Sequence, residues 1–187
     1  YTETPTYFQR PAFGLGVNVN AIGAFSFATG RNTFASGNTS YAEGSGTTAG
    51  GAQSHAEGFT TKALGDAAHA EGYETNASTF AAHTEGFQTF AGYVCHAEGN
   101  QTTANGNWSH AEGGFTIATG NTSHAEGNQT RAFGQYSHAE GNSTQATGNT
   151  SHAEGNSTRA FGTYSHAEGE NTIVWGASSH AEGSYTT

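Results

Sequence analysis

The chain has 187 residues, 28 of them glycine, and its formal net charge at pH 7 is −10 when histidine is neutral. Only 33% of the residues are hydrophobic, which is a low apolar content for a globular domain of this length. The shortage of lysine and arginine disfavours nucleic-acid binding, and a single cysteine, Cys95, excludes an internal disulfide framework. No stretch is long and apolar enough to predict insertion into a membrane.

The sequence divides into a short leader and a long repeat. Residues 1–11 follow no repeat, and we expect an N-terminal extension there that caps the fold or joins it to a neighbour. From residue 12 to residue 187 a 14-residue unit recurs, and this fixed period argues against disorder. We expect one β-solenoid domain of about thirteen coils that continues or is truncated at the C-terminus.

One full unit reads Ser-His-Ala-Glu-Gly-x-x-Thr-x-Ala-x-Gly-x-x. It holds two short alternating segments, which predict two short strands per coil and an all-β fold of parallel coils stacked about 4.8 Å apart. Glycine at each corner is expected to supply the positive φ that tight turns need. A flattened coil has little internal volume, so we expect small side chains such as Ala125, Thr130 and Ala132 to point inward. Histidine and glutamate then point outward.

Near the N-terminus the histidine position holds Phe13, Phe27 and Tyr41, and the glutamate position begins with Leu15. Further along, histidine and glutamate form two predicted outward columns. Their members are His55, Glu57, His69, Glu71, His83, Glu85, His96, Glu98, His110, Glu112, His124, Glu126, His138, Glu140, His152, Glu154, His166, Glu168, His180 and Glu182.

The two columns dominate the charge of the chain, since ten protonated histidines would cancel the formal charge of −10. Stacked glutamates repel one another, and a neighbouring histidine relieves this through a charge-assisted hydrogen bond. We interpret the columns as a structural histidine–glutamate network between chains. Two alternatives stay open: a metal ion held by a ring of three histidines on a three-fold axis, and simple exposure to solvent. Ten near-identical copies disfavour an active site, so we expect neither catalysis nor a cofactor.

Two irregularities of the repeat lie next to each other. Thr79 replaces the second glycine of its unit, and the following unit is one residue short, so His83 and His96 are 13 residues apart. We expect a local bulge or a change of twist between residues 80 and 94. Cys95, which replaces the serine of the unit, is expected to be a buried and inert thiol.

From residue 98 onward, large and small side chains alternate in a 28-residue super-repeat. The large members are Trp108, Phe133, Tyr136, Phe161, Tyr164 and Trp175. The alternation has two interpretations of equal standing. It relieves crowding between neighbouring coils, or it presents exposed aromatic rings, spaced about 10 Å apart, to a carbohydrate or a protein receptor.

The unit resembles the head repeats of trimeric autotransporter adhesins of the YadA-like, Hep/Hag type, which run Ser-Val-Ala-Ile-Gly-x-x-Ser-x-Ala-x-Gly. The resemblance is strongest in residues 12–16 and 20–30, where Phe13 and Leu15 take the valine and isoleucine positions. The Ser-His-Ala-Glu-Gly arrays are also similar to repeats of phage tail fibres. The resemblance implies a left-handed parallel β-roll and three chains whose valine and isoleucine columns face a common axis. Histidine and glutamate depart from that apolar core.

We therefore expect a non-enzymatic, extracellular fibre segment on a cell surface, filament or virion that adheres to a surface or binds a receptor. Thin coils bury little apolar surface alone, so a parallel homotrimer is expected, with Phe13, Leu15 and Phe27 as an apolar plug on its axis. One alternative is the subunit of a filament assembled head to tail. A second is a monomeric ice-binding solenoid, which would require an outward threonine array.

Overall fold

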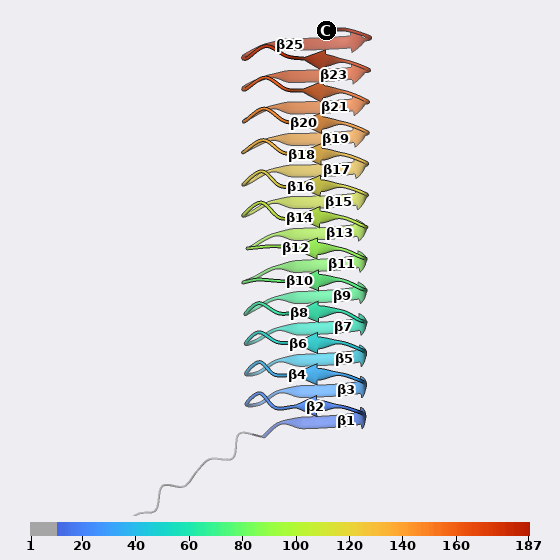
Figure 1. Cartoon of the computed structure of the whole chain (residues 1–187), viewed down its shortest axis with the longest axis vertical. Coiled ribbons are helices and arrows are strands. Elements are labelled where there is room, and N and C mark those ends of the chain that lie inside the picture. The colour runs from blue at the N-terminus through green and yellow to red at the C-terminus, as the bar shows by residue number, and fades with distance from the viewer. Residues whose placement is uncertain (1–10) are drawn as a thin grey trace, which may run out of the picture.

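The computed structural model describes residues 11–187, and Figure 1 shows them as a straight stack of coils. Each coil contributes one long and one short strand, and all strand pairing is parallel between successive coils. The predicted all-β parallel solenoid with a 14-residue spacing is thereby confirmed. None of the described residues forms a helix of the length and apolarity that crossing a membrane requires. The expected N-terminal extension, apart from Pro11, lies outside the described residues.

The long strands form a sheet of thirteen strands along one face of the solenoid. They are β1 (Phe13–Val17), β3 (Phe27–Arg31), β5 (Tyr41–Ser45), β7 (His55–Phe59), β9 (His69–Tyr73), β11 (His83–Phe87), β13 (His96–Asn100), β15 (His110–Gly114), β17 (His124–Asn128), β19 (His138–Asn142), β21 (His152–Asn156), β23 (His166–Glu170) and β25 (His180–Ser184). The register places every residue directly against its repeat equivalent, so histidine pairs with histidine and glutamate with glutamate.

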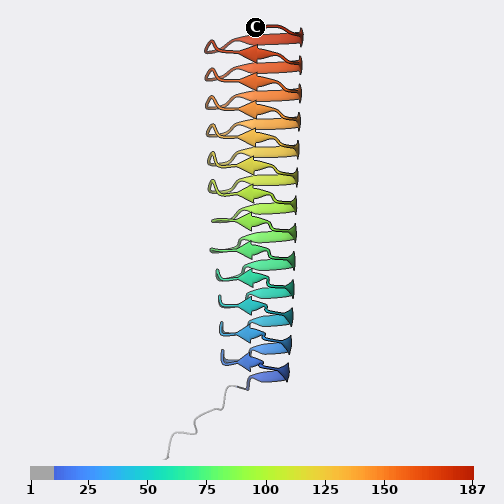
Figure 2. The same ribbon diagram turned by 45° about the vertical axis from the view of Figure 1, so that its right-hand side comes forward.

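The short strands form a second sheet of twelve strands on the opposite face. They are β2 (Asn20–Ala21), β4 (Phe34–Ala35), β6 (Thr48–Ala49), β8 (Lys62–Ala63), β10 (Asn76–Ala77), β12 (Phe90–Ala91), β14 (Thr103–Ala104), β16 (Ile117–Ala118), β18 (Arg131–Ala132), β20 (Gln145–Ala146), β22 (Arg159–Ala160) and β24 (Ile173–Val174). Figure 2 shows that both sheets run along the long axis of the solenoid and that turns at both edges join their strands.

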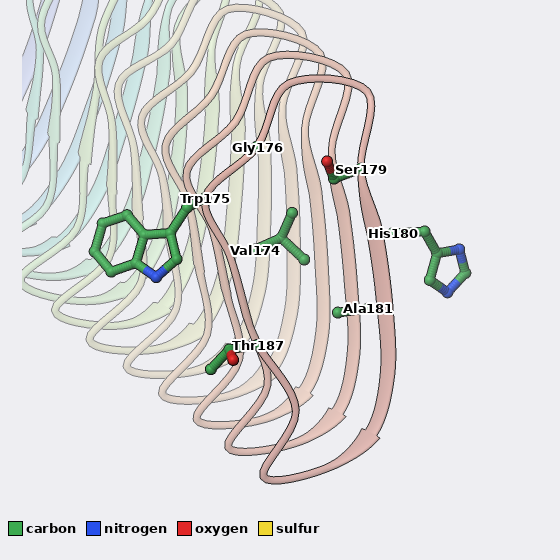
Figure 3. Close-up of a pocket in the computed structure, with 7 residues that line it drawn as sticks. All are labelled: Val174, Trp175, Gly176, Ser179, His180, Ala181 and Thr187. Atoms are coloured by element: carbon green, nitrogen blue, oxygen red, sulfur yellow. The ribbon is translucent and has the colours of Figure 1, made fainter.

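The core between the two sheets is built almost entirely from small side chains. Ala125, Thr130 and Ala132 are each fully buried, as are their equivalents in nearly every described coil. The predicted inward set is therefore confirmed. Figure 3 shows the cross-section at the last coil, where Val174 and Ala181 point into the coil while Trp175 and His180 point out of its opposite sides.

The two recurring glycines of each unit share a steric role, because a Cβ on Gly141 or on Gly148 would collide with the backbone of the next coil, but they differ in backbone conformation. The glycine within the long strand, such as Gly141, has a positive φ of 105° to 139° along the stack, as expected. The turn glycine, such as Gly148, has no positive φ, so the expectation that it supplies one is wrong. It is glycine because a Cβ there would collide with the carbonyl oxygen of Gly162 in the next coil. The left-handed turn residues are mostly not glycine and include Thr150 and Tyr164.

The short coil leaves both sheets uninterrupted. His83 pairs with His96 and Ala91 with Ala104 in the ordinary register, so the bulge expected in this region is not found in the strands. The Gly92 amide donates to the carbonyl of Ala104 as the residue before a turn glycine does elsewhere, so the missing residue is the turn glycine itself. Its absence removes the backbone that would collide with a side chain at Thr79. The two irregularities of the sequence therefore compensate for each other.

Cys95 lies in the turn that ends this coil. Its thiol is free and 2% exposed, and Sγ lies 2.8 Å from the carbonyl oxygen of Gly106. The expected buried thiol is confirmed.

Adjacent glycines Gly50 and Gly51 provide a test of the steric role of the turn glycine. A Cβ on Gly51 would collide with backbone atoms of Gly65, whereas a Cβ on Gly50 would lie 3.4 Å from the flexible end of Leu64. We expect Gly51→Ala to lower the free energy of unfolding by about 3 kcal/mol, as overpacking against backbone does. Gly50→Ala should leave it within about 1 kcal/mol of the parent. Equal effects of the two changes in urea unfolding would contradict this assignment.

Candidate functional site

The outward face of the long-strand sheet carries an unbroken column of aromatic rings. Phe13, Phe27 and Tyr41 begin it, and the ten histidines continue it in successive coils. Neighbouring ring centroids are 4.6 to 5.3 Å apart. The spacing follows from the distance between paired strands, so the backbone holds each ring against its neighbours. The aromatic residues at the N-terminal end thus belong to the same column as the histidines.

The glutamate column runs beside the ring column. In nine of the ten coils Nε2 of the histidine lies 3.5 to 4.0 Å from Oε2 of the glutamate in the same coil. These separations suit an ion pair but exceed those of a charge-assisted hydrogen bond. His138 and Glu140 have side chains that are 40% and 49% exposed, so one chain alone leaves the columns partly solvated.

Tyr41 shows what a direct hydrogen bond in this column looks like. Its hydroxyl donates to Oε2 of Glu43 at 2.5 Å, within one coil. That hydrogen bond is the main reason why the pKa of Tyr41 is raised above its ordinary value, and partial burial adds to it. A phenol reaches the carboxylate that the shorter imidazole only approaches.

Five of the stacked imidazoles favour their neutral form. The pKa values of His55, His83, His96, His138 and His166 are lowered, first by burial and then by repulsion from neighbouring histidines. The adjacent glutamates raise the histidine pKa, but their effect is smaller than the combined effect of burial and the neighbouring histidines. Stacking like groups at this spacing therefore limits how many can carry a proton at once.

The predicted N-terminal plug residues share this face. Phe13 is 54% exposed and Leu15 is 62% exposed, and the ring of Phe27 stacks on that of Phe13 at 5.3 Å. Val17, which the sequence analysis did not single out, lies on the same strand and is 62% exposed. The first coils therefore present an apolar patch where the later coils present histidine and glutamate.

The super-repeat aromatics lie on the turns and the short-strand side. Trp108, Tyr136 and Tyr164 project from left-handed turn positions and are 57 to 66% exposed. Phe133 is half-buried, whereas Phe161 and Trp175 occupy successive coils and stack at 4.4 Å. Aromatic rings on neighbouring coils are therefore compatible with the fold at that position, which weakens crowding as the reason for the alternation.

Turn asparagines account for part of the same alternation. Oδ1 of Asn121 accepts a hydrogen bond from the amide of Asn107 in the preceding coil, and Asn149 does the same for Gln135. Both asparagines precede a threonine, whereas the coil between them carries Tyr136 and the coil after Asn149 carries Tyr164. The chain thus alternates coils that cap a turn with coils that present a ring.

A further aromatic ladder was not identified from the sequence. Phe59, Tyr73 and Phe87 end β7, β9 and β11, and their rings stack at 5.0 and 5.1 Å. They lie on the face of the histidine and glutamate columns and are 39 to 45% exposed. Their regular 14-residue spacing, directly after the strand glycine, was the signal that could have revealed them.

Over residues 11–187, the structure lacks the outward array of the regular repeat threonines that the ice-binding alternative requires. The regular threonines of the repeat, from Thr33 to Thr172, are buried and 0 to 2% exposed. An ice-binding face would need those hydroxyls in an outward array.

The lowered histidine pKa values predict acid sensitivity. The unfolded chain binds more protons than the folded chain as pH falls below the ordinary value of about 6.5, so the free energy of unfolding should decrease there. We expect a lower urea midpoint at about pH 5.5 than at about pH 7.5. His138→Phe should reduce this difference, because Phe27 shows that the column accepts that ring. A midpoint that stays constant or rises on acidification would contradict the prediction.

Comparison with known proteins identifies the repeat. The family model of the YadA head domain repeat matches the chain in two copies, residues 28–54 and 97–123. The second copy includes His110 and Glu112, so the match extends into the coils with polar columns. A search of curated proteins found no match. Two segments of the chain thus match the YadA head domain repeat, and the resemblance to adhesin head repeats is confirmed.

Proposed function

We propose that the chain is a non-enzymatic segment of an extracellular fibre, in which three parallel chains pack through their long-strand faces and exposed aromatic rings contact a receptor. The observation that carries this proposal is the match of the adhesin head repeat to a solenoid with two differently built outer sides. One side carries continuous columns, and the other carries separated exposed rings such as Tyr136 and Tyr164.

The long-strand face is suited to a repeated contact with copies of the same chain. Its columns have the same register over thirteen coils, so one favourable contact between chains recurs along the whole fibre. The histidine and glutamate side chains are only partly buried in one chain, which leaves the exposed part of each imidazole and carboxylate available for a neighbouring chain, although Nε2 itself is shielded. A polar interface of this kind is stable when its groups find partners across it.

The apolar patch of the first coils supports the same arrangement. Phe13, Leu15 and Val17 are more than half exposed in one chain, and burying them against two copies would remove apolar surface from water. The interior of each coil, built from alanine, serine and threonine, supplies little apolar burial of its own. Association would therefore contribute a large share of the stability.

The assembly prediction has a matched control within the same coils. Replacing Phe13, Leu15 and Phe27 together with serine should weaken the trimer and shift sedimentation toward smaller species at about micromolar concentration. Replacing Ile22, Phe25 and Phe34 with serine removes exposed apolar side chains outside the long-strand face and should leave the trimer intact. A well-folded monomer of the parent chain at this concentration would refute the proposed assembly.

The receptor contact is tested through the exposed rings at the turn position, of which Trp108 also packs edge-on against Tyr93, with ring centroids 6.1 Å apart. Replacing Trp108, Tyr136 and Tyr164 with threonine should preserve folding, since Thr122 and Thr150 occupy the same turn position in the coils between them. Binding to immobilised glycans or matrix proteins should fall about tenfold or more, as loss of aromatic contacts at an interface does.

A second ladder provides the control for this experiment. Phe59, Tyr73 and Phe87 can be replaced with asparagine, which Asn128 and Asn142 show to be accepted at that position. These residues lie on the long-strand face, so sedimentation must first show that the variant keeps the assembly of the parent chain; receptor binding should then be unaltered. If the threonine variant unfolds, or binds as well as the parent, the receptor role of the turn aromatics is wrong.

A further inference from the structure

Two neighbouring coils bring two imidazoles and one carboxylate into a compact group. The ligand atoms of His152, Glu154 and His166 all lie within 4.8 Å of one another, which no other group of three achieves among residues 11–187. The rings of His152 and His166 are nearly parallel, with an interplanar angle of 6° and centroids 4.7 Å apart. Both imidazoles therefore present equivalent nitrogens on the same side of the column.

The nitrogen atoms in this group have no competing partner. Nε2 of His152 and Nε2 of His166 are each shielded from solvent and make no hydrogen bond. Oε2 of Glu154 lies 3.8 Å from Nε2 of His152, and Oε2 of Glu168 lies 4.0 Å from Nε2 of His166. Unpartnered buried nitrogens beside carboxylates are costly, and a cation would satisfy all of them together.

We propose that His152, Glu154 and His166 bind a divalent transition-metal ion of the zinc class within a single chain. Two imidazoles and a carboxylate form a donor set that Zn²⁺ accepts, with water or Glu168 as the fourth ligand. Tetrahedral bonds of about 2.0–2.1 Å require ligand atoms roughly 3.4 Å apart, so the side chains must close by about 1 Å. The side chains of His152 and Glu154 are 38% and 46% exposed, which gives them room to turn toward an entering ion.

This site differs from a metal ion on a three-fold axis, because every protein ligand comes from one chain. It lies on the long-strand face through which the chains are proposed to pack, but it needs no residue of a second chain and no receptor contact. The coil of His83 and Glu85 offers a comparison, since that pair does not come within ion-pair distance in the described structure, unlike the pairs at His69 and His96. The repeat supplies the residue types in every coil, and the local geometry selects this step.

Zinc titration of the full chain by calorimetry at about pH 7.5 tests the proposal. We expect about one tight equivalent per chain, weakened at least tenfold by Glu154→Gln and by His166→Phe. Phe is accepted in this column, as Phe27 shows, and Gln keeps the shape of the carboxylate. The matched controls Glu85→Gln and His83→Phe should leave the tight equivalent unchanged.

The outcomes that overturn the proposal are distinct. Absence of a tight equivalent in the parent chain would refute it, as would an equal loss in the control variants. One ion per three chains would assign the metal to an axis between chains instead. Circular dichroism of each variant checks folding, and should His166→Phe not fold, the comparison of Glu154→Gln with Glu85→Gln decides. Perturbation of the His152 and His166 imidazole signals by Zn²⁺ gives a readout that does not depend on affinity.

Discussion

The distance between paired parallel strands, about 4.8 Å, is the constraint on which the rest of this molecule depends. The register stacks every residue on its own repeat equivalent, so the residue type at each position of the 14-residue unit forms a continuous column along the solenoid. A side chain is tolerated only if it packs against copies of itself at that distance. Aromatic and imidazole rings satisfy this requirement by stacking, and buried alanine satisfies it by being small.

The same constraint acts on the backbone. At the turn glycine, successive coils approach so closely that a Cβ would meet the carbonyl oxygen of the next coil. The turn glycine meets a demand for space alone, whereas the strand glycine, such as Gly141, meets both a positive φ and a close approach of the next coil. Left-handed turn positions are filled by residues such as Trp108 and Ser143, at a cost of roughly 1 kcal/mol each, while glycine is reserved for the point of contact. The regular ladder of hydrogen bonds on both faces offsets that cost.

The sequence predicted the coil length, the two strands and the inward side chains because a period of 14 and an alternation of 2 leave little freedom. It could not distinguish glycine needed for φ from glycine needed for space, since both read as a corner. The sequence showed that Thr79 is followed by a shortened coil. It could not show that the two irregularities compensate for each other, because this depends on which backbone atoms of the next coil lie against residue 79. At the candidate site, the alternation of the sequence predicted the histidine and glutamate columns. It could not predict the distance between Nε2 and Oε2, which decides whether each pair can form a hydrogen bond.

Repulsion between like charges limits how many coils can stack the same ionised side chain in one column. A glutamate column alone would accumulate repulsion with every coil, and a fully protonated histidine column would do the same with the opposite sign. Burial and neighbouring imidazoles lower the pKa of His138, so this ring favours its neutral form while the carboxylate of Glu140 stays partly solvated. Apolar adhesin heads avoid this balance by placing valine and isoleucine at these positions. If chains pack through this face as proposed, histidine and glutamate make that packing dependent on pH and on cations, which an apolar interface does not allow.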